Sequence, residues 1–222
     1  MDLSRRQNIA RKIRGLYVII DAQAAGSKDL VDLASRVLAG GASTIQLRDK
    51  INDKGDVLQV ARRIRQLCED FGALLIVNDH ADLAVACDAH GLHLGQHDLP
   101  IQEARYILHP NQIIGTSNAL LEEAVESEKQ GADYLAVGAI FPTNTKERTR
   151  PAGLETLEQV TAKALVPVVA IGGISHENVR QVMSGGADAA CVVSAVIDDQ
   201  DPQGAARRFV DSIIQSTSSK QA

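Results

Sequence analysis

The sequence lacks the features of an exported, membrane-spanning or zinc-cluster protein. Its three cysteines, Cys68, Cys87 and Cys191, are far apart and form no C-x-x-C pair, so we expect buried, reduced thiols. The polar and basic N-terminal segment lacks the apolar core of a signal peptide. No run of about 18 apolar residues could form a transmembrane helix. These absences predict a cytoplasmic protein that does not enter a membrane.

Charge and composition exclude further classes. The formal net charge of -5 and the pI near 5.7 argue against broad attraction to nucleic acid or to anionic membranes. With 222 residues and 45% hydrophobic content, the chain can bury one large core, and no Pro-, Gly- or Ser-rich break divides it. The sequence therefore predicts a single domain over residues 1–222, with polar tails at about 1–14 and 216–222.

Short β-rich runs alternate with longer segments of helical period along the chain. Segments such as Leu30–Leu38, Val57–Cys68 and Ala119–Lys129 place apolar residues three and four positions apart, which is typical of amphipathic helices. The β-rich runs are Leu16–Ile20, Thr44–Leu47, Ala73–Val77, Leu92–Leu94, Ile113–Gly115, Tyr134–Ile140, Val168–Ile171 and Ala189–Val193.

Two α/β architectures are compatible with this alternation. Eight units of about 28 residues each fit a single-domain (β/α)8 TIM barrel. A doubly wound open sheet is the alternative, but its G-x-G-x-x-G turn is missing after the first run, where Asp21–Gly26 follows. Glycines at Gly40-Gly41, Gly131 and Gly185-Gly186 separate helices from the next runs, where a left-handed cap is expected. The barrel is favoured.

Several apolar runs end abruptly in charged or amide residues. In a parallel barrel the C-terminal ends of the strands meet at one rim, so clusters distant in sequence would form one pocket. The clusters are Gln46–Lys50, Asn78–His80, Gln96–Asp98, Thr143–Lys146 and Gly172–Gly173.

The first cluster combines an amide with two cations. The period of a strand places Gln46, Arg48 and Lys50 on one side. A planar guanidinium beside a mobile ammonium suits a diphosphate better than a neutral ligand. An exposed charged loop is the alternative interpretation, since such loops are common at strand ends.

Two carboxylates follow neighbouring strands. Asp79 ends the third run and Asp98 lies just beyond the fourth, so they could share Mg²⁺, which takes one or two protein carboxylates. Alternatively, both residues cap the following helices. His93 and His97 are four positions apart, but on a strand this spacing does not indicate a metal pair, and we expect structural or supporting roles. No catalytic triad pattern occurs.

The remaining clusters point to a second anion site. Thr143, Thr145 and Lys146 offer two hydroxyls and an ammonium in a long loop, whose segment 144–150 is a candidate lid or an ordinary mobile loop. Gly172-Gly173 and Val193-Ser194 end the last two strands, where barrels often bind phosphate, although turns also need glycine. Together these signals predict two phosphorylated small-molecule substrates.

Seven motifs lie in a fixed order around the eight units: Gln46-x-Arg48-x-Lys50, Asn78-Asp79, His93-Leu94-Gly95-Gln96-His97-Asp98, Gly115-Thr116-Ser117, Pro142-Thr143-x-Thr145-Lys146, Ile171-Gly172-Gly173-Ile174 and Val193-Ser194-Ala195. In order and spacing, these motifs closely resemble the thiamine phosphate synthase family over about Leu16 to Ile214. The resemblance implies that a hydroxymethylpyrimidine diphosphate loses pyrophosphate and that its methylene is captured by the nitrogen of a thiazole phosphate.

The resemblance also implies roles for residues. Arg48, Lys50 and Lys146 would stabilise the leaving pyrophosphate, and Asp79 with Asp98 would hold Mg²⁺. The pyrimidine diphosphate would contact Gln46, Arg48, Lys50, Asn78, Ser117 and Lys146, and the thiazole phosphate would contact Thr143, Thr145, Gly173, Val193 and Ser194.

Two other functions remain open at this point. The related thiazole tautomerase also resembles the chain, but the tautomerase carries an acid/base histidine at the position where this sequence has Ala139. A non-catalytic protein could also use the same pocket to bind thiamine phosphate. The full set of cations and carboxylates favours the synthase, because a pure binder has little need to stabilise a leaving group.

Overall fold

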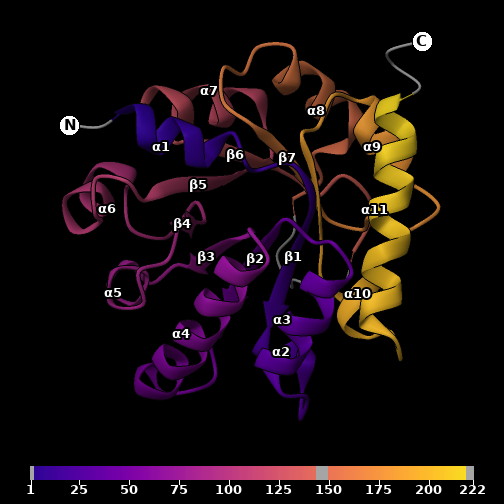
Figure 1. The fold of residues 1–222 in the computed structure, drawn as a ribbon. Coiled ribbons are helices and arrows are strands. Elements are labelled where there is room, and N and C mark those ends of the chain that lie inside the picture. Colours follow the sequence, from indigo (N-terminus) through magenta and orange to yellow (C-terminus); the bar gives the residue numbers. More distant parts are fainter. Residues whose placement is uncertain (1–2, 144–149, 219–222) are drawn as a thin grey trace.

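Eight parallel strands close into a barrel in the order β1-β2-β3-β4-β5-β6-β7-β8, and helices surround it (Figure 1). The computed structural model describes residues 3–143 and 150–218. The predicted (β/α)8 TIM barrel is confirmed. The strands are β1 (Gly15–Asp21), β2 (Thr44–Arg48), β3 (Leu74–Asn78), β4 (Gly91–Leu94), β5 (Ile113–Asn118), β6 (Tyr134–Val137), β7 (Val168–Ile171) and β8 (Ala189–Val192).

The helices mostly follow the strands, and the long α11 packs beside α3 and α9 (Figure 1). None of the helices in the described part of the chain is both long and apolar enough to cross a membrane. The helices are α1 (Leu3–Ala10), α2 (Ala22–Ala25), α3 (Leu30–Ala39), α4 (Lys54–Asp70), α5 (Ala81–Ala86), α6 (Ile101–Ile107), α7 (Leu121–Lys129), α8 (Gly153–Thr161), α9 (Val179–Ser184), α10 (Ser194–Ile197) and α11 (Pro202–Ser218).

Strand residues alternate between two apolar layers. Ile19 and Ile76 belong to the core inside the barrel, whereas Ile20 and Leu75 pack in the layer between the strands and the helices. This alternation decides which polar residues can reach the centre of the barrel and which face outward.

Three glycines make the turns from helices back to strands. Gly41, Gly131 and Gly186 have φ of 100°, 100° and 95°, in the left-handed region that a side chain disfavours. The predicted helix-to-strand joints are therefore confirmed, and each one starts a strand at the N-terminal end of the barrel.

The N-terminal segment differs from the predicted polar tail, because it contains α1. Ala10 and Ile13 are buried beside Ile113 inside the barrel, and Arg6 Nε lies 2.8 Å from Asp133 Oδ1. The few apolar residues give a weak sequence pattern, yet they cover the N-terminal end of the barrel. At the other terminus, α11 extends through Ser218 into the predicted tail.

Strand β6 ends at Val137, three residues before the predicted end at Ile140. The Ala139 amide donates to the Arg150 carbonyl at 2.9 Å, so the chain leaves the strand to meet the returning loop. Pairing resumes at Ile140, whose amide donates to the Ile171 carbonyl at 3.0 Å. Strand β5, by contrast, continues past Gly115 to Asn118.

Two predicted helices lie within longer ones, while α7 starts later than expected. The α3 and α4 helices include the predicted segments, but α7 begins at Leu121 instead of Ala119. The Glu123 carboxylate accepts hydrogen bonds from the Ala119 and Leu120 amides at 2.8 and 3.3 Å. These bonds hold the two residues as a cap instead of a helical turn.

Candidate active site

The end of β2 delivers the amide and the two cations to the C-terminal rim. Gln46 is buried and its Nε2 donates to the Tyr17 hydroxyl at 2.7 Å, so its side chain lies inside the barrel. Arg48 pairs with Asp21, and Lys50 Nζ lies 2.8 Å from Asp79 Oδ2. The Lys50 side chain is 48% exposed, which leaves the ammonium accessible to a ligand at the rim.

Asp21 is a site residue that the sequence motifs missed. It directly follows the apolar part of β1, and one carboxylate oxygen accepts from the Gln23 and Ala24 amides at 3.0 and 3.2 Å. The other oxygen accepts a hydrogen bond from Arg48. Asp21 therefore caps α2 and orients the guanidinium. Its position at a strand end was the signal that could have identified it.

Asp79 and Asp98 meet beside Lys50. Burial acts to raise the pKa of Asp79, but hydrogen bonds with Lys50 and Asp98 outweigh it and the net pKa is lowered. Burial, followed by the hydrogen bond with Asp79, raises the pKa of Asp98. Of the two carboxyl groups, Asp98 therefore holds a proton more readily than Asp79. Asp98 Oδ2 also accepts from the Gly95 amide at 2.7 Å.

Asp79 and Asp98 do not cap the helices that follow them, which was the alternative interpretation of these two carboxylates. His80 occupies the cap position of α5 and Pro100 that of α6, and neither position has a side-chain capping bond. Asp79 instead adopts φ of 62°, a left-handed conformation that Asp tolerates better than most residues. This conformation turns the end of β3 so that its carboxylate faces Lys50.

The donor set fits a hard cation held by few protein ligands. Within the described residues, no group of three or more His, Cys, Asp or Glu side chains gathers around a common point. Asp79 and Asp98 supply a pair of carboxyl groups beside Lys50. Mg²⁺ commonly takes one or two carboxylates and completes its coordination with water and substrate phosphate. The geometry therefore suits Mg²⁺ better than a zinc site.

A hydrogen-bonded group lines the interior below the rim. His93 Nδ1 lies 2.9 Å from the Tyr134 hydroxyl, and Nε2 lies 2.9 Å from Ser117 Oγ. The Tyr134 and Tyr17 hydroxyls are 3.1 Å apart. Gln46, His93 and Ser117 line a small cavity together with both tyrosines. His93 thus supports Ser117 from inside the barrel, in keeping with a supporting role for the histidine.

The last two strands supply the glycine and serine positions of the second predicted anion site. Gly173 has φ of 65°, and a Cβ there would lie 2.6 Å from the Pro142 carbonyl, so a side chain would not fit. Its own carbonyl accepts from Asn178 Nδ2 at 2.9 Å. Val193 and Ser194 follow β8 directly, with Ser194 starting α10.

The rim brings together most of the predicted site residues. Because all strands are parallel, the residues at their C-terminal ends lie at the same face. Thr145 and Lys146 lie outside the described residues, as does most of the predicted lid segment. Residues placed at this face are Gln46, Arg48, Lys50, Asn78, Asp79, Asp98, Ser117, Thr143, Gly173, Val193 and Ser194.

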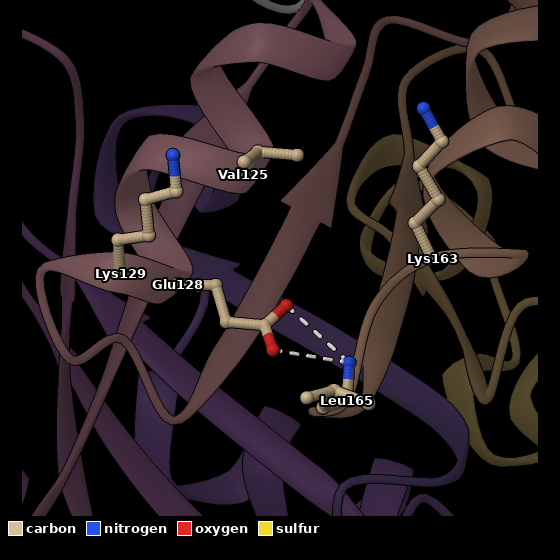
Figure 2. A pocket seen from close by; sticks show the side chains of 5 residues that line it. All are labelled: Val125, Glu128, Lys129, Lys163 and Leu165. Atoms are coloured by element: carbon tan, nitrogen blue, oxygen red, sulfur yellow. Dashed lines mark hydrogen bonds between the residues drawn. The ribbon is translucent and has the colours of Figure 1, made fainter.

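A second depression lies away from the C-terminal rim, between α7 and the loop before β7 (Figure 2). The Glu128 carboxylate accepts from the Leu165 amide at 3.1 and 3.3 Å across it, while Lys129 and Lys163 extend outward. The depression is therefore a contact between a helix and a loop, at the opposite end of the barrel from the rim.

Comparisons with known proteins agree with the rim chemistry. A family model described as thiamine monophosphate synthase matches residues 16–196. The thiamine-phosphate synthase of Shouchella clausii is 44% identical over 88% of this chain and 94% of that protein. That of Moorella thermoacetica is 45% identical over 87% of this chain and 93% of that protein.

A solved structure gives the same result. The thiamine phosphate pyrophosphorylase of Pyrococcus furiosus superposes with a TM-score of 0.87 at 40% identity, covering 94% of this chain and 99% of that one. The region matched by the family model contains β2 to β8 and all of β1 except Gly15. The chain belongs to the thiamine-phosphate synthase family and is a transferase of thiamine biosynthesis.

Proposed function

We propose that the enzyme joins 4-amino-2-methyl-5-hydroxymethylpyrimidine diphosphate to 4-methyl-5-(2-phosphoethyl)thiazole, or to the carboxylated form of this thiazole. The products are thiamine phosphate and pyrophosphate, and the carboxylated thiazole also releases its carboxyl group as CO2. The C–O bond between the pyrimidine methylene and the diphosphate breaks, and a C–N bond to the thiazole nitrogen forms. The observation that carries the proposal is the carboxyl pair Asp79–Asp98 beside Lys50 at the rim.

The proposal assigns the diphosphate to the Arg48 and Lys50 side of the rim. Asp21 orients the Arg48 guanidinium for planar oxygen acceptors, and Lys50 is exposed enough to move from Asp79 to a phosphate oxygen. Mg²⁺ on Asp79 and Asp98 would neutralise charge on the leaving pyrophosphate. Lys146 is proposed to add a further cation. These groups make the loss of pyrophosphate easier by stabilising charge that develops as the bond breaks.

A dissociative reaction needs no protein nucleophile. The aminopyrimidine ring can stabilise a methylene cation, so the protein must chiefly bind the ring and exclude water. Gln46, Asn78 and Ser117 are proposed to contact the pyrimidine part. All three lie in the C-terminal parts of strands β2, β3 and β5, and Gln46 and Ser117 also line the interior cavity.

The thiazole phosphate is proposed to bind beside β7 and β8. Gly173 has a positive φ and packs closely against the Pro142 carbonyl, and the backbone of this turn is proposed to contact the phosphate. Val193 and Ser194 offer backbone amides at the following strand end. Thr143 and Thr145 are proposed to add hydroxyls from the loop after β6.

A direct assay tests this function. Purified enzyme, Mg²⁺ and the two phosphorylated heterocycles are mixed, and thiamine phosphate and pyrophosphate are measured by chromatography. Equal amounts of both products support the synthase. Conversion of the thiazole alone would instead indicate a tautomerase, and tight binding of thiamine phosphate without any product would indicate a binding protein. Omission of Mg²⁺ should suppress pyrophosphate release.

A further inference from the structure

The carboxylate of Glu123, in α7, joins two segments of the rim that are far apart in the sequence. Its Oε2 accepts from the Ala119 and Leu120 amides at 2.8 and 3.3 Å, just beyond the end of β5. The Arg150 guanidinium binds the same carboxylate twice, with Nη1 2.6 Å from Oε1 and Nη2 2.9 Å from Oε2. Arg150 begins the segment 150–152, which leads into α8 and is called the returning limb below. Glu123 therefore connects the end of β5 to the returning limb.

A second contact fixes α7, and with it Glu123, to the end of β5. Ser127 Oγ in α7 donates to Asn118 Oδ1 at 2.9 Å, and both residues are buried. Asn118 Nδ2 in turn donates to the Thr116 carbonyl at 3.1 Å. Asn118 directly follows Ser117, which is proposed to contact the pyrimidine. The carboxylate of Glu123 thus has a defined position relative to the pyrimidine side of the rim.

Backbone hydrogen bonds continue the connection from Arg150 to the thiazole side of the rim. The Ala139 amide donates to the Arg150 carbonyl at 2.9 Å. Two residues further along the chain, the Phe141 amide donates to the Gly172 carbonyl at 3.0 Å. Gly172 directly precedes Gly173, which is proposed to contact the thiazole phosphate. The pair of Glu123 and Arg150 therefore links the two proposed halves of the site through described residues alone.

The exposure of this ion pair suits orientation more than stability. The Arg150 side chain is 54% exposed, so solvent screens its charge, whereas the Glu123 side chain is 21% exposed. Burial acts to raise the pKa of Glu123, but the hydrogen bonds from Arg150 and from the Ala119 amide outweigh it, and the net pKa is lowered. The carboxylate is therefore ionised at neutral pH. Two parallel N–H···O bonds to a planar guanidinium then fix the direction of the returning limb.

We propose that Glu123 and Arg150 are positioning residues that hold the two halves of the rim at the separation needed to join the substrates. The inference rests on the proposed function, because it concerns the same two substrates. Capture requires the pyrimidine methylene and the thiazole nitrogen to lie within about 3–3.5 Å of each other. If the halves shift apart, the methylene cation left after loss of pyrophosphate is open to water. Water then adds to the methylene, a proton passes to solvent, and the hydroxymethylpyrimidine forms instead of thiamine phosphate.

The ratio of thiamine phosphate to pyrophosphate tests the inference during turnover. The wild-type enzyme should form the two products in equal amounts. Arg150→Met should form thiamine phosphate about tenfold more slowly and lower the ratio about twofold or more, with the hydroxymethylpyrimidine accounting for the difference. Arg208→Met is the matched control, because the Arg208 side chain is also 54% exposed and also pairs with one carboxylate, Asp199. The control should retain the wild-type rate and ratio.

Two further variants separate the ion pair from its individual members. Glu123→Gln can still accept from the backbone amides but loses the charged partner, so it should lower the ratio as Arg150→Met does. The double variant should be no worse than either single variant, because both remove the same contact. Arg150→Lys keeps the charge without the planar fork and should recover part of the ratio.

Amide hydrogen exchange, followed by nuclear magnetic resonance, tests the connection without substrate. The Ala139 amide donates to the returning limb, and the Ala152 amide donates from that limb to the Ala139 carbonyl at 2.8 Å. Both amides should exchange about tenfold faster in Arg150→Met, since the limb loses the side chain that holds it. The Ala42 amide, which donates to the Val37 carbonyl before β2, should exchange at the wild-type rate. The urea unfolding midpoint should change little.

Three results would overturn the inference: a wild-type product ratio in Arg150→Met, additive losses in the double variant, or unchanged exchange of the Ala139 and Ala152 amides. The proposed function fails on a different result, which is the absence of thiamine phosphate from the wild-type reaction. The exchange rates would then still decide whether the pair of Glu123 and Arg150 holds the returning limb. The two failures are therefore distinguishable.

Discussion

The carboxylates at the two ends of the barrel differ in the cations that they contact. At the N-terminal end, Asp133 lies 2.8 Å from Arg6 and 2.7 Å from Arg105, and it also accepts from the Ile114 amide at 2.8 Å. At the C-terminal rim, Asp79 and Asp98 lie together beside Lys50. At the N-terminal end, one carboxylate therefore contacts two cations. At the C-terminal rim, two carboxyl groups lie beside one cation.

This difference separates stability from function. A buried carboxylate with two arginines and a backbone amide is fully satisfied and holds α1 and α6 against β6. At the rim one ammonium faces two carboxyl groups, and a divalent cation held by Asp79 and Asp98 would offset the repulsion between them.

Removal of one rim carboxylate should give the largest effect. We expect Asp79→Asn to lower the rate of thiamine phosphate formation about 1000-fold, equivalent to ~4 kcal/mol, because metal and leaving-group stabilisation are lost. The free energy of unfolding should fall by less than ~1 kcal/mol, since Asn also tolerates a positive φ. Steady-state kinetics and urea unfolding measure the two quantities.

Asp88→Asn is the matched control for this variant. Asp88 also has a left-handed conformation, with φ of 51°, but it is exposed and lies between α5 and β4, away from the rim. The Asp88→Asn variant should therefore retain wild-type kinetics. Wild-type turnover in Asp79→Asn would contradict the role assigned to the rim carboxylates.

A half-buried histidine at the N-terminal end, His90, should make stability depend on pH. Burial, followed by Arg65 and Lys12, lowers the pKa of His90 to about 4, and its Nδ1 accepts from the Leu75 amide at 2.9 Å. The folded state binds this proton less readily than the unfolded state. Stability is therefore complete above about pH 6.5 and declines as the pH falls toward 4, by up to ~3 kcal/mol.

Urea unfolding between pH 7.5 and 4.5, about the range in which an ordinary histidine titrates, measures this decline. His90→Gln provides the comparison, because the amide oxygen can accept the bond without titrating. The wild-type enzyme should lose more stability than His90→Gln as the pH falls. Parallel pH profiles for the two proteins would refute the role of His90.

Loss of one arginine at the N-terminal end should destabilise the fold while activity persists. Arg105→Met leaves Asp133 with Arg6 and the Ile114 amide, so we expect a decrease of about 2 kcal/mol in the free energy of unfolding. The kcat at 25 °C should stay within twofold of wild type. Arg208→Met is the control: its side chain is 54% exposed, and its pair with Asp199 should contribute little to stability because solvent screens it. Equal effects of the two substitutions would contradict the comparison.

The smallest effect is expected at Asp21. Asp21→Asn keeps the cap on α2 but removes the charged partner of Arg48, so the KM for the pyrimidine diphosphate should rise about fivefold, or ~1 kcal/mol. Asp29→Asn is the matched control, because Asp29 caps α3 through two backbone amides. An unchanged KM in Asp21→Asn would show that Arg48 does not depend on this pair.

The sequence predicted the rim better than the residues that support it. Charged residues directly after apolar runs indicated Arg48, Lys50 and Asp79, because strand ends of a parallel barrel converge. Asp21 ends a strand in the same way, but no motif singled it out. Tyr17 and Tyr134 looked like ordinary apolar strand residues, since the partners of their hydroxyls lie on other strands.

Local periodicity determined the eight strands, the glycine turns and the face of β2 that carries Gln46, because each depends on residues close together in the chain. Only the tertiary structure decided that Asp79 and Asp98 lie together beside Lys50, that α1 covers one end of the barrel, and that hydrogen bonds through Tyr17, Tyr134 and His93 join Gln46 to Ser117. These features depend on distances between separate strands and on burial, and neither quantity is encoded in the spacing of a single segment.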